Sequence, residues 1–597
     1  MTAKNKGLIA ALVVLAALAA VPWVFGSFTV SLFNDIGMAT LVVLGLVLLS
    51  GVAGITSYGH AAFVGIAAYA AAWFNTELAL SPWLALPGAL AITGFSALII
   101  GGLTLRLGGH YLPLSTIAWG LSVPLVFGNM TMLGRHSGIA DIAPVSLGGA
   151  ELLSAEAAFY LIWVAVAGTA VFCLHLLNSR VGRAIRALRG GNILLSSVGA
   201  NPFRVRLTLF VFSALLAALS GWLYAHVNRF VSPAPFSLHA SIDYMFMMVV
   251  GGMNQLAGAV VGAGVVLALK NVLQDVLPLV SDHAAQIQAV VFAALFILLL
   301  QRARGGLMGV FARLADRLPG SGAVSGAVPA APLADPLPKR AMPPKGTPLL
   351  EIGAVVKRFK GLVAVNEVGF DVRAGEMIGL IGPNGAGKST MFNLITGTLE
   401  LSGGRIAFQG QDITRRSQRE IALMGMARTF QHVKLRPQMS VLDNVALGAH
   451  ARGHSGFLRG GLNLDAAEER RIYAEAWRQV DRIGLADQAL HPAGSMPLGT
   501  QRLIEIARAL ASDPLLLILD EPAAGLRKPE KKALADLLTR LREEGVTIMI
   551  VEHDMDFVMK LVDRLVVMNF GTKLFEGAPQ AARADKGVRA AYLGDAA

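Results

Sequence analysis

The stretch Gly382-Pro-Asn-Gly-Ala-Gly-Lys-Ser389-Thr390 decides the fold of the second half of this chain of 597 residues. It fits the spacing G-x-x-x-x-G-K-[ST]. A strand-like apolar run that ends at Ile381 precedes it, and apolar residues at helical spacing continue from Met391. Glycines let backbone N–H groups close around phosphate oxygens, and the start of the next helix adds positive potential. This context predicts a phosphate-binding loop and argues against a chance match in a glycine-rich chain.

The side chains of this loop have distinct predicted roles. We expect Lys388 to contact the β- and γ-phosphates of ATP and to take part in catalysis, and we expect Ser389 to ligate Mg²⁺. The residues predicted to contact the nucleotide here are Gly382, Pro383, Asn384, Gly385, Ala386, Gly387, Lys388, Ser389 and Thr390.

Two acidic residues, Asp520 and Glu521, end a second strand-like run at 515–519. Five apolar residues without alternation are typical of a central parallel strand. Such a strand end places Asp520 near Mg²⁺, and it places Glu521 where it polarises or deprotonates the attacking water. The alternative is an ordinary surface strand end.

Three further residues complete the predicted site. Gln431 fits a glutamine that senses Mg²⁺ and the γ-phosphate, so it is both a metal and a nucleotide candidate. His553 follows another buried strand run and is predicted to be a catalytic switch at the γ-phosphate, although a lone histidine is often structural. Phe359 lies 29 positions before Lys388 and is predicted to stack on adenine; the alternative is a place in the core.

The first half of the chain has a different composition. The whole chain is 54% hydrophobic, which is too apolar for an ordinary soluble protein, and the apolar runs lie between residues 8 and 301. The net charge of +12 does not indicate nucleic acid, because many Arg and Lys residues flank apolar runs as in positive-inside membrane proteins. Cys173 is the single cysteine, which excludes disulfides within the chain and cysteine-based metal sites.

The apolar runs predict a polytopic helical domain. Lys4 and Lys6 precede the first run, Leu8 to Phe25, which we interpret as a membrane span and not as a cleaved signal peptide. Further candidate spans lie near 30–49, 59–75, 83–105, 112–128, 157–177, 206–228, 242–270 and 286–301.

The span at 242–270 is too long for one crossing and is interrupted at Gly251-Gly252-Met-Asn254. If it forms two short half-helices, the chain crosses about ten times and both ends lie inside. Asp275 and Asp282 then face outside, while Arg302 and Arg304 face inside. Broken helices at membrane depth are tolerated only against protein or a water-filled cavity, so we expect this break to line a pathway through the membrane domain.

The segment from Ser179 to Arg206 is rich in arginine and contains no acid. It lies between two predicted spans and reads as cytoplasmic, with a short helix at 188–199. The simple interpretation is a positive-inside loop; the more specific hypothesis is a coupling helix that docks on the ATPase. Later in the chain, residues 319–348 are rich in Pro, Ala and Gly, which predicts a flexible coil that spans roughly 30 Å.

The first half resembles the permeases of branched-chain amino-acid (Liv-type) ABC importers. The resemblance is carried by Leu49-Ser-Gly-Val-Ala-Gly-Ile-Thr-Ser-Tyr-Gly-His-Ala-Ala-Phe-Val-Gly-Ile-Ala-Ala-Tyr69, by Leu105-Arg-Leu-Gly-Gly-His-Tyr-Leu112 and by Ser179-Arg-Val-Gly-Arg-Ala-Ile-Arg-Ala-Leu-Arg189. One departure is the sequence Gly190-Gly-Asn192, where the family is usually acidic.

The second half resembles an ABC-type ATPase over residues 349 to 594. Gln501 to Leu510 resembles the helix after the ABC signature. Ala427-Arg-Thr-Phe-Gln431, the polar stretch 449–470 and the ending Ala591-Tyr-Leu-Gly594 are most similar to Liv-type ATPase subunits.

The signature itself departs from the family pattern L-S-x-G-Q. It reads Met496-Pro497-Leu498-Gly499-Thr500, so Gly499 is kept as a nucleotide contact while the serine and the glutamine are lost. Arg527 also stands where a small polar residue is usual.

The expected architecture is a polytopic α-helical membrane domain of about ten spans followed by an α/β P-loop ABC ATPase domain. Its predicted boundaries are 1–305 for the permease, 306–347 for the linker and 348–597 for the ATPase. The resemblance implies ATP-driven uptake of branched-chain or other small apolar amino acids, or related organic solutes, across the bacterial inner membrane, with a cytoplasmic ATPase. It also implies four partners: a second permease subunit, a second ABC ATPase domain, an external substrate-binding protein, and the lipid bilayer around the membrane domain. No nucleic acid is expected as a partner.

Two other functions stay open at this point. An ABC exporter would also fuse a membrane domain to an ATPase, but exporters of that type use about six long helices, whereas this chain has about ten compact spans. An ATP-gated channel or regulator would not need the intact Glu521 and His553. The sequence shows no charge pair within the membrane domain, which favours an apolar or zwitterionic cargo.

Overall fold

The computed structural model describes residues 16–107, 111–279, 284–302, 305–316 and 334–593. Two compact units divide the chain: the first contains residues 1–177 and 203–325, and the second contains residues 178–202 and 326–597. The predictions for Gly108–His110, Asp282, Arg304, Gly594 and residues 8–15 of the first span lie outside the described residues.

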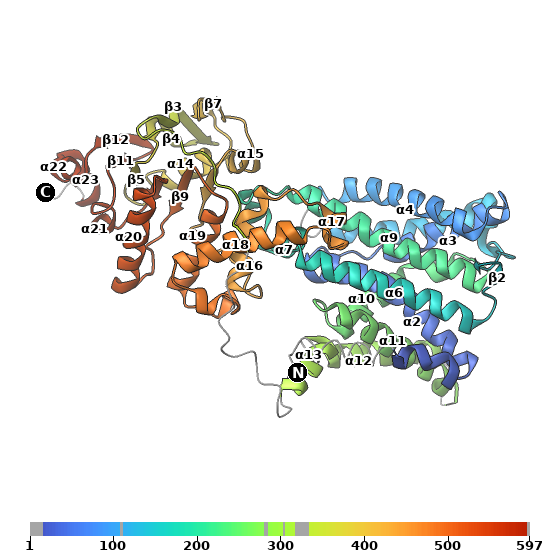
Figure 1. Cartoon of the computed structure of the whole chain (residues 1–597). Helices are drawn as coiled ribbons and strands as arrows, with labels where there is room; N and C mark the ends of the chain where they lie inside the picture. The colour runs from blue at the N-terminus through green and yellow to red at the C-terminus, as the bar shows by residue number, and fades with distance from the viewer. Residues whose placement is uncertain (1–15, 108–110, 280–283, 303–304, 317–333, 594–597) are drawn as a thin grey trace. The chain divides into compact units, whose positions relative to one another are not determined.

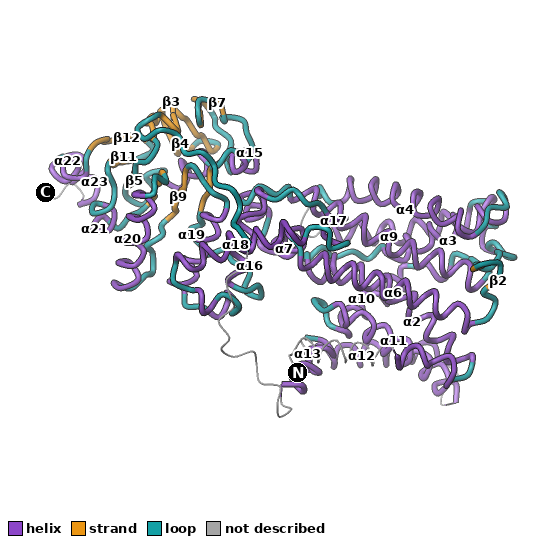
Figure 2. Tube along the Cα trace, in the orientation of Figure 1, coloured by secondary structure: helices purple, strands orange, loops and turns teal. Residues whose placement is uncertain are grey.

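The described part of the first unit is almost entirely helical (Figures 1 and 2). Its helices are α2 (Ser27–Leu46), α3 (His60–Thr76), α4 (Pro82–Thr104), α5 (Tyr111–Asn129), α6 (Ala155–Asn178), α9 (Pro202–Asn228), α10 (Leu238–Gly251), α11 (Leu256–Val276), α12 (Ala284–Arg302) and α13 (Gly306–Asp316). A π-helical turn, η1 (Val47–Val52), extends α2, and the strands β1 (Ser146–Leu147) and β2 (Ala150–Glu151) form a small hairpin.

Six helical stretches in the described part of the chain are long and apolar enough to cross a membrane. They are Ser27–Val52, Pro82–Thr104, Tyr111–Asn129, Ala155–Asn178, Pro202–Asn228 and Leu256–Leu279. Helix α10 is apolar but short, at 14 residues. These elements confirm the polytopic helical domain, while the number of about ten crossings stays a prediction.

The predicted break in the span at 242–270 is present between α10 and α11, where Gly252 has φ +126°. The expectation of two short halves is wrong for the second one, because α11 is 21 residues long. Glycines let the two helices pack closely: a Cβ on Gly262 would lie 1.8 Å from the carbonyl oxygen of Met247. A Cβ on Gly51 of η1 would lie 1.6 Å from the carbonyl oxygen of Met253, so the break packs against the π turn.

The sequence-based expectation that the membrane domain holds no charge pair is wrong. Lys270 of α11 donates a hydrogen bond to the carboxylate of Asp243 of α10, and its ammonium group lies 5.8 Å from the ring centre of Phe292. The two residues are 27 positions apart, and only the packing of α10 on α11 brings them together. The absence of a charge pair therefore no longer supports an apolar cargo.

The second unit contains the cassette, residues 348–593, and the arginine segment, residues 178–202. The cassette has a six-stranded sheet in the order β12-β11-β5-β10-β9-β8 and a four-stranded antiparallel sheet in the order β4-β3-β6-β7. The strands are β3 (Pro348–Phe359), β4 (Leu362–Arg373), β5 (Met377–Ile381), β6 (Gly403–Phe408), β7 (Gln411–Asp412), β8 (Met426–Arg428), β9 (Leu516–Asp520), β10 (Thr547–Val551), β11 (Arg564–Asn569) and β12 (Thr572–Gly577).

The helices of the cassette are labelled in Figure 1. They are α14 (Lys388–Ile395), α15 (Gln418–Leu423), α16 (Val441–Gly448), α17 (Phe457–Gly461), α18 (Ala466–Arg482), α19 (Leu498–Ala511), α20 (Lys528–Glu543), α21 (Met555–Val558), α22 (Pro579–Ala584) and α23 (Lys586–Leu593). The arginine segment contributes α7 (Arg180–Ala187), α8 (Asn192–Ser197) and the 3₁₀ turn η4 (Leu188–Gly190).

The apolar runs of the sequence form the central strands of the larger sheet, as predicted. All five residues of β5, β9 and β10 are buried. Successive side chains point to opposite faces: Ile518 joins the cluster with the smaller sheet, and Leu517 joins the cluster with α19 and α20. Both faces are covered, which is why these strands show no polar alternation.

The expectation of a free coil over 319–348 does not hold for residues 334–347, which we call the strap. Leu337 is 7% exposed and packs into an apolar cluster with side chains of α16, α18 and α19. The sequence showed a single leucine among prolines here, and such a pattern does not reveal a partner elsewhere in the chain.

Candidate functional site

The phosphate loop lies at the carboxyl end of β5, which pairs in parallel with β10 and β11. Helix α14 begins at Lys388, and Gly387 at its N-cap has φ +96°. A Cβ on Gly387 would lie 2.5 Å from the carbonyl oxygen of Ala364, so no other residue fits without a shift of the backbone. The loop therefore has the strand–glycine–helix geometry that suits an anion.

The Lys388 side chain folds back over the loop. Its ammonium group donates to the carbonyl oxygens of Gly382 at 2.7 Å and Pro383 at 2.9 Å, and the residue is buried. Burial lowers the pKa of Lys388, and the carboxylates of Glu521 and Asp520 oppose this shift. Two carbonyl oxygens of the loop thus hold the Lys388 ammonium group over the loop.

Asp520 ends β9 and is buried, and its Oδ1 atom has no hydrogen-bond partner. Burial raises the pKa of Asp520 to about 6, and the neighbouring Arg428 guanidinium opposes the shift. A buried carboxylate oxygen without a partner is costly unless it meets a ligand. Ser389 and Gln431, which line the adjacent cavity, offer further oxygen atoms, and a set of oxygen donors alone would fit Mg²⁺.

Glu521 follows Asp520 directly and lies between two other predicted site residues. Its Oε2 accepts a hydrogen bond from Gln431 Nε2 at 3.3 Å, and its Oε1 lies 3.8 Å from His553 Nδ1. The backbone of Glu521 has φ +45°, a strained conformation for a residue with a Cβ. Its N–H donates to the carbonyl oxygen of Val551 at 2.8 Å, and this bond to β10 holds the strained turn in place.

A cavity of about 580 Å³ extends from the phosphate loop. It is lined by Phe359, Leu362, Val363, Ala364, Asn384, Gly385, Ala386, Gly387, Lys388, Ser389, Thr390, Gln431, Glu521, Phe570 and Gly571. Phe359, the predicted adenine contact, lines this cavity, and the residue is 42% exposed. Sequence reasoning missed Phe570, an 88% exposed aromatic with φ +44° in the turn between β11 and β12. The only sequence signal for it was an aromatic residue within the turn-like sequence Asn-Phe-Gly.

Gly499 does not line this cavity and lies at the start of α19, whose N-cap is Pro497. A Cβ on Gly499 would lie 2.8 Å from the carboxyl carbon of Glu530. Arg527 holds that carboxylate through its backbone N–H at 2.8 Å and its guanidinium at 2.9 Å. The two departures seen in the sequence, at 497 and at 527, thus meet at the same end of α19.

The arginine segment lies against a surface of the cassette that we call the dock, formed by residues 418–423, 449–461 and 465–473. The Arg180 guanidinium donates to three carbonyl oxygens, those of His450 at 2.6 Å, Gly453 at 2.8 Å and Ser455 at 2.6 Å. The carboxylate of Glu468 lies 3.8 Å from Arg180 Nε. Backbone carbonyls and one acid thus enclose a single cation.

Arg183 is the second anchor and is 1% exposed. It donates to Glu469 Oε2 at 2.7 Å, and its guanidinium lies 4.9 Å from the ring centre of Tyr473. Burial lowers the pKa of Arg183, but Tyr473 and Glu469 outweigh it and the net shift is upward. Arg183 therefore stays charged in the dock.

The far end of the arginine segment is held through its backbone. Gln418 and Arg419 donate to the carbonyl oxygens of Ile193 at 3.3 Å and Gly199 at 3.0 Å. The expectation of one short helix at 188–199 is wrong, because the contacts come from α7, from α8 and from Gly199 just after α8. Sequence reasoning missed the acceptors Glu468 and Glu469, because their only signal was a place within a polar stretch.

Comparisons with known proteins agree with this geometry. Residues 28–300 match the family described as the branched-chain amino acid transport system permease component, and residues 365–524 match the ABC transporter family. The high-affinity branched-chain amino acid transport ATP-binding protein LivG of Salmonella typhimurium is 42% identical over 254 residues, which are 42% of this chain and 99% of LivG. The corresponding protein BraF of Pseudomonas aeruginosa is 39% identical over 254 residues, with the same two shares.

Among solved structures, a nucleotide-free ATP-binding cassette from an ABC transporter is 31% identical. It is matched over its whole length by 42% of this chain, with a TM-score of 0.37. The permease family model ends before the linker, and the ABC model lies within the cassette. The chain carries an ABC ATPase that couples ATP hydrolysis to transport, and it belongs to the branched-chain amino-acid (Liv-type) ABC transporter family, with a permease and an ATP-binding component in one polypeptide.

Proposed function

We propose that this chain is the fused permease and ATPase component of an importer that takes up branched-chain or other small apolar amino acids, or related small organic solutes, across the bacterial inner membrane. The observation that carries the proposal is the dock. A segment of the permease sequence, with Arg180 and Arg183, is held by the ATPase cassette of the same chain. Such a contact transmits motion between an ATPase and a membrane domain.

The roles of the nucleotide-site residues follow from their positions. Lys388 and the N–H groups of the phosphate loop bind the β- and γ-phosphates, with Phe359 beside the adenine. Glu521, held by Gln431 and close to His553, polarises the water that attacks the γ-phosphorus and accepts its proton as the bond to the β-phosphate oxygen breaks.

Ser389, Asp520 and Gln431 would hold Mg²⁺, and the ion would offset the negative charge of the phosphates when bound. Asp520 contributes the buried oxygen that has no other partner. The pKa of about 6 at Asp520 means that its carboxyl is mostly ionised, and able to take a cation, at neutral pH.

Gly499 at the start of α19 serves the nucleotide site of a second ABC ATPase domain, in a head-to-tail pair. A second permease subunit and an external substrate-binding protein complete the assembly. The cassette then faces the cytoplasm and the first unit lies in the lipid bilayer, as the flanking arginines Arg302 and Arg189 support.

Reconstitution tests the proposal directly. The complex, purified with its partner subunits and placed in liposomes with the cassette outside, should move a labelled branched-chain amino acid out of liposomes loaded with the cargo and its binding protein. The transport should require ATP and disappear with Glu521→Gln. Movement of cargo in the opposite direction would show an exporter, and a conductance that persists with Glu521→Gln would show a channel.

Orientation has its own test. In a Cys173→Ala background, a cysteine replacing Asp275 should react with an impermeant thiol reagent from outside the cell, and a cysteine replacing Arg189 should not. The Arg189 position is the matched control, because the topology places the two residues on opposite sides. Labelling of the Arg189 position from outside would reverse the orientation.

A further inference from the structure

The strap, residues 334–347, lies along the cassette and contacts it at three successive points. Four prolines lie within it, Pro336, Pro338, Pro343 and Pro344, and they favour an extended chain with little conformational entropy to lose on docking. The strap contains no helix or strand of its own. Its path is therefore set by its contacts with the cassette.

The first contact is apolar and lies in the helical part of the cassette. Leu337 is buried among side chains of α16, α18 and α19, including Val445, Ile472 and Ile504. The backbone carbonyls of Leu337 and Pro338 accept hydrogen bonds from Arg452 at 3.0 and 2.9 Å.

The second contact lies at the start of the central strands. The backbone N–H of Arg340 donates to the carboxylate of Asp513, which precedes β9. The Arg340 guanidinium donates to the carbonyl oxygen of Leu423 at 3.2 Å, beside Gly425 at the start of β8. The strap thereby contacts both the helical part and the sheet.

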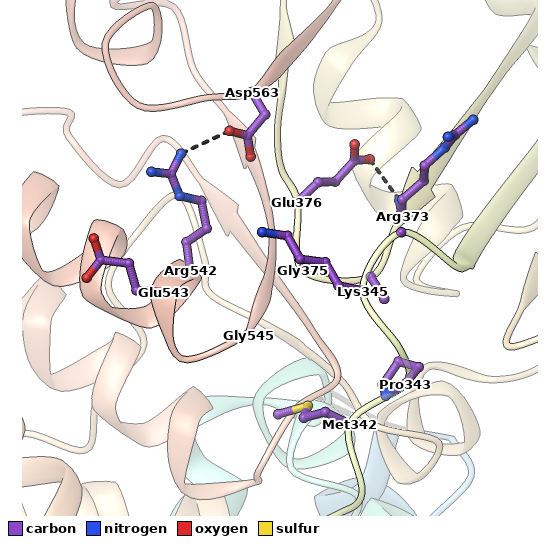
Figure 3. Close-up of a pocket in the computed structure, with 12 residues that line it drawn as sticks. Met342, Pro343, Lys345, Arg373, Gly375, Glu376, Arg542, Glu543, Gly545 and Asp563 are labelled. Atoms are coloured by element: carbon purple, nitrogen blue, oxygen red, sulfur yellow. Dashed lines mark hydrogen bonds and ion pairs between the residues drawn. The ribbon is translucent and has the colours of Figure 1, made fainter.

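The third contact ends the strap at the turn before β5. Gly346 donates to the carbonyl oxygen of Ala374 at 2.9 Å, and Ala374 donates back to Thr347 at 2.8 Å. Between the second and third contacts the strap borders a hollow of about 590 Å³. Figure 3 shows Met342 and Pro343 on one side of this hollow and the Arg542–Asp563 ion pair on the other.

Arg452 connects the strap to the dock. It ends the 3₁₀ turn η7 (Ala449–Arg452), whose residue His450, with the following Gly453, supplies two of the carbonyl oxygens that hold Arg180. Arg452 also donates to Ala511 at 2.9 Å and lies 3.3 Å from the fully buried carboxylate of Glu475. The carbonyl oxygens of Leu337 and Pro338 in the strap therefore accept the remaining hydrogen bonds of Arg452, which holds turn η7 in place.

We propose that the strap is a brace for the dock: it positions turn η7 through Arg452, so that the same linker that joins the two halves of the chain also shapes the surface on which the arginine segment docks. The proposed function is needed only for the consequence of the brace, which is the transmission of motion from the ATPase to the membrane domain. Leu337 and Arg452 act as positioning residues, and neither lines the cavity at the phosphate loop. The strap is thus part of the coupling contact and does more than connect the two halves of the chain.

Hydrogen exchange on the purified full-length chain tests the brace. Leu337→Ser removes the apolar anchor, and Lys339→Ser, an exposed position two residues away, is the matched control. With Leu337→Ser we expect exchange in peptides covering 449–455 and 180–187 to be roughly tenfold faster. Peptides covering 382–395 and the dissociation constant for ATP should stay within about twofold, because the strap does not contact the phosphate loop. Leu337→Met, which conserves volume, should restore the slow exchange.

Two results would overturn the brace. If the exchange rate of peptides covering 449–455 is unchanged in Leu337→Ser, the strap only connects the two halves of the chain. If exchange is accelerated equally throughout α16, α18 and α19, Leu337 is an ordinary core residue. The measurement needs neither cargo nor partner subunits, so it decides on the brace even if the chain fails to import the amino acids tested.

Discussion

The nucleotide end of the cassette and the dock both use backbone groups to stabilise a charge, but the two charges have opposite signs. At the nucleotide end, N–H groups at the start of α14 and the Lys388 ammonium are arranged for an anion. At the dock, the carbonyl oxygens of His450, Gly453 and Ser455 surround the Arg180 cation. The anion site is built from one short stretch of chain, whereas the cation site joins residues about 270 positions apart.

Because of this difference, we expect that a substitution can disrupt the nucleotide end or the dock without disrupting the other. The nucleotide end depends on local geometry that survives changes elsewhere in the chain. The dock depends on packing between distant segments, with Arg183 1% exposed and Glu469 supplied by α18. Changes at one end should therefore leave the other end intact.

The largest effect is expected from Glu521→Gln at the nucleotide end. ATP turnover of the purified complex should fall by about 10²-fold or more, the scale of losing a positioned base, while ATP still binds. Lys388→Ala should instead weaken binding itself, and equilibrium dialysis with labelled ATP separates the two outcomes. Glu400→Gln, at an exposed position, is the matched control. Robust turnover by Glu521→Gln would remove Glu521 from the catalytic role.

The second prediction concerns the start of α19, where Pro497 has no hydroxyl and no N–H, and the Glu530 carboxylate lies beside Gly499. A lost hydrogen bond to a charged group costs about 1.5–3 kcal/mol, or roughly ten- to a hundredfold. In a mixed pair of ATPase domains, the site that borrows this chain's signature should therefore be the slower one. In a homodimer both sites would carry the defect.

Single-site variants measure this asymmetry. Glu521→Gln should reduce ATP turnover more than the equivalent change in the partner domain, if the partner's signature is intact. Pro497→Ser should bring the two losses closer together. Equal losses in the starting complex would show that Pro497 is a tolerated variation.

The third prediction concerns a substitution that disrupts the dock and leaves the nucleotide end unchanged. Arg183→Ala removes a charged hydrogen bond to Glu469, worth about 1.5–3 kcal/mol, so cargo moved per ATP hydrolysed should fall roughly tenfold while basal hydrolysis continues. The exposed Arg470→Ala is the control. Arg183→Glu combined with Glu469→Arg should recover part of the coupling. A parallel loss of basal hydrolysis would contradict the independence of the two ends.

The smallest effect is a pH dependence of the dock. Burial, together with Arg180 and Arg183, lowers the pKa of His450 from 6.5 to about 3, so His450 is neutral in the folded state at neutral pH. Between these values the unfolded chain binds the extra proton. The free energy of unfolding therefore falls as the pH falls below about 6.5, by up to ~1.4 kcal/mol per pH unit.

Thermal unfolding of the full chain between pH 7 and pH 5 measures this slope. His450→Gln should flatten it, and His454→Gln, an exposed neighbour, should not. An identical slope in all three proteins would assign the pH dependence to other groups, among which Asp520, with its raised pKa, has the opposite sign.

Most residues of the candidate nucleotide site could be proposed from the sequence because they lie at strand ends and in one loop. Parallel strands bring their carboxyl ends to one edge, so the ends of β5, β9 and β10 meet there. Asp520 and His553 follow directly from that rule. This rule does not predict Phe570, because an exposed aromatic residue in a turn gives no periodic signal in the sequence.

The sequence by itself determined the class of the protein: the phosphate loop, the apolar runs and the arginine-rich segment are local patterns with local physical causes. Tertiary structure alone decided which distant groups meet. It paired Asp243 with Lys270, placed Glu530 beside Gly499, and seated Leu337 in the helical core. Local patterns follow from backbone geometry over a few residues, whereas these contacts depend on how whole helices pack, and side-chain packing leaves no period in the sequence.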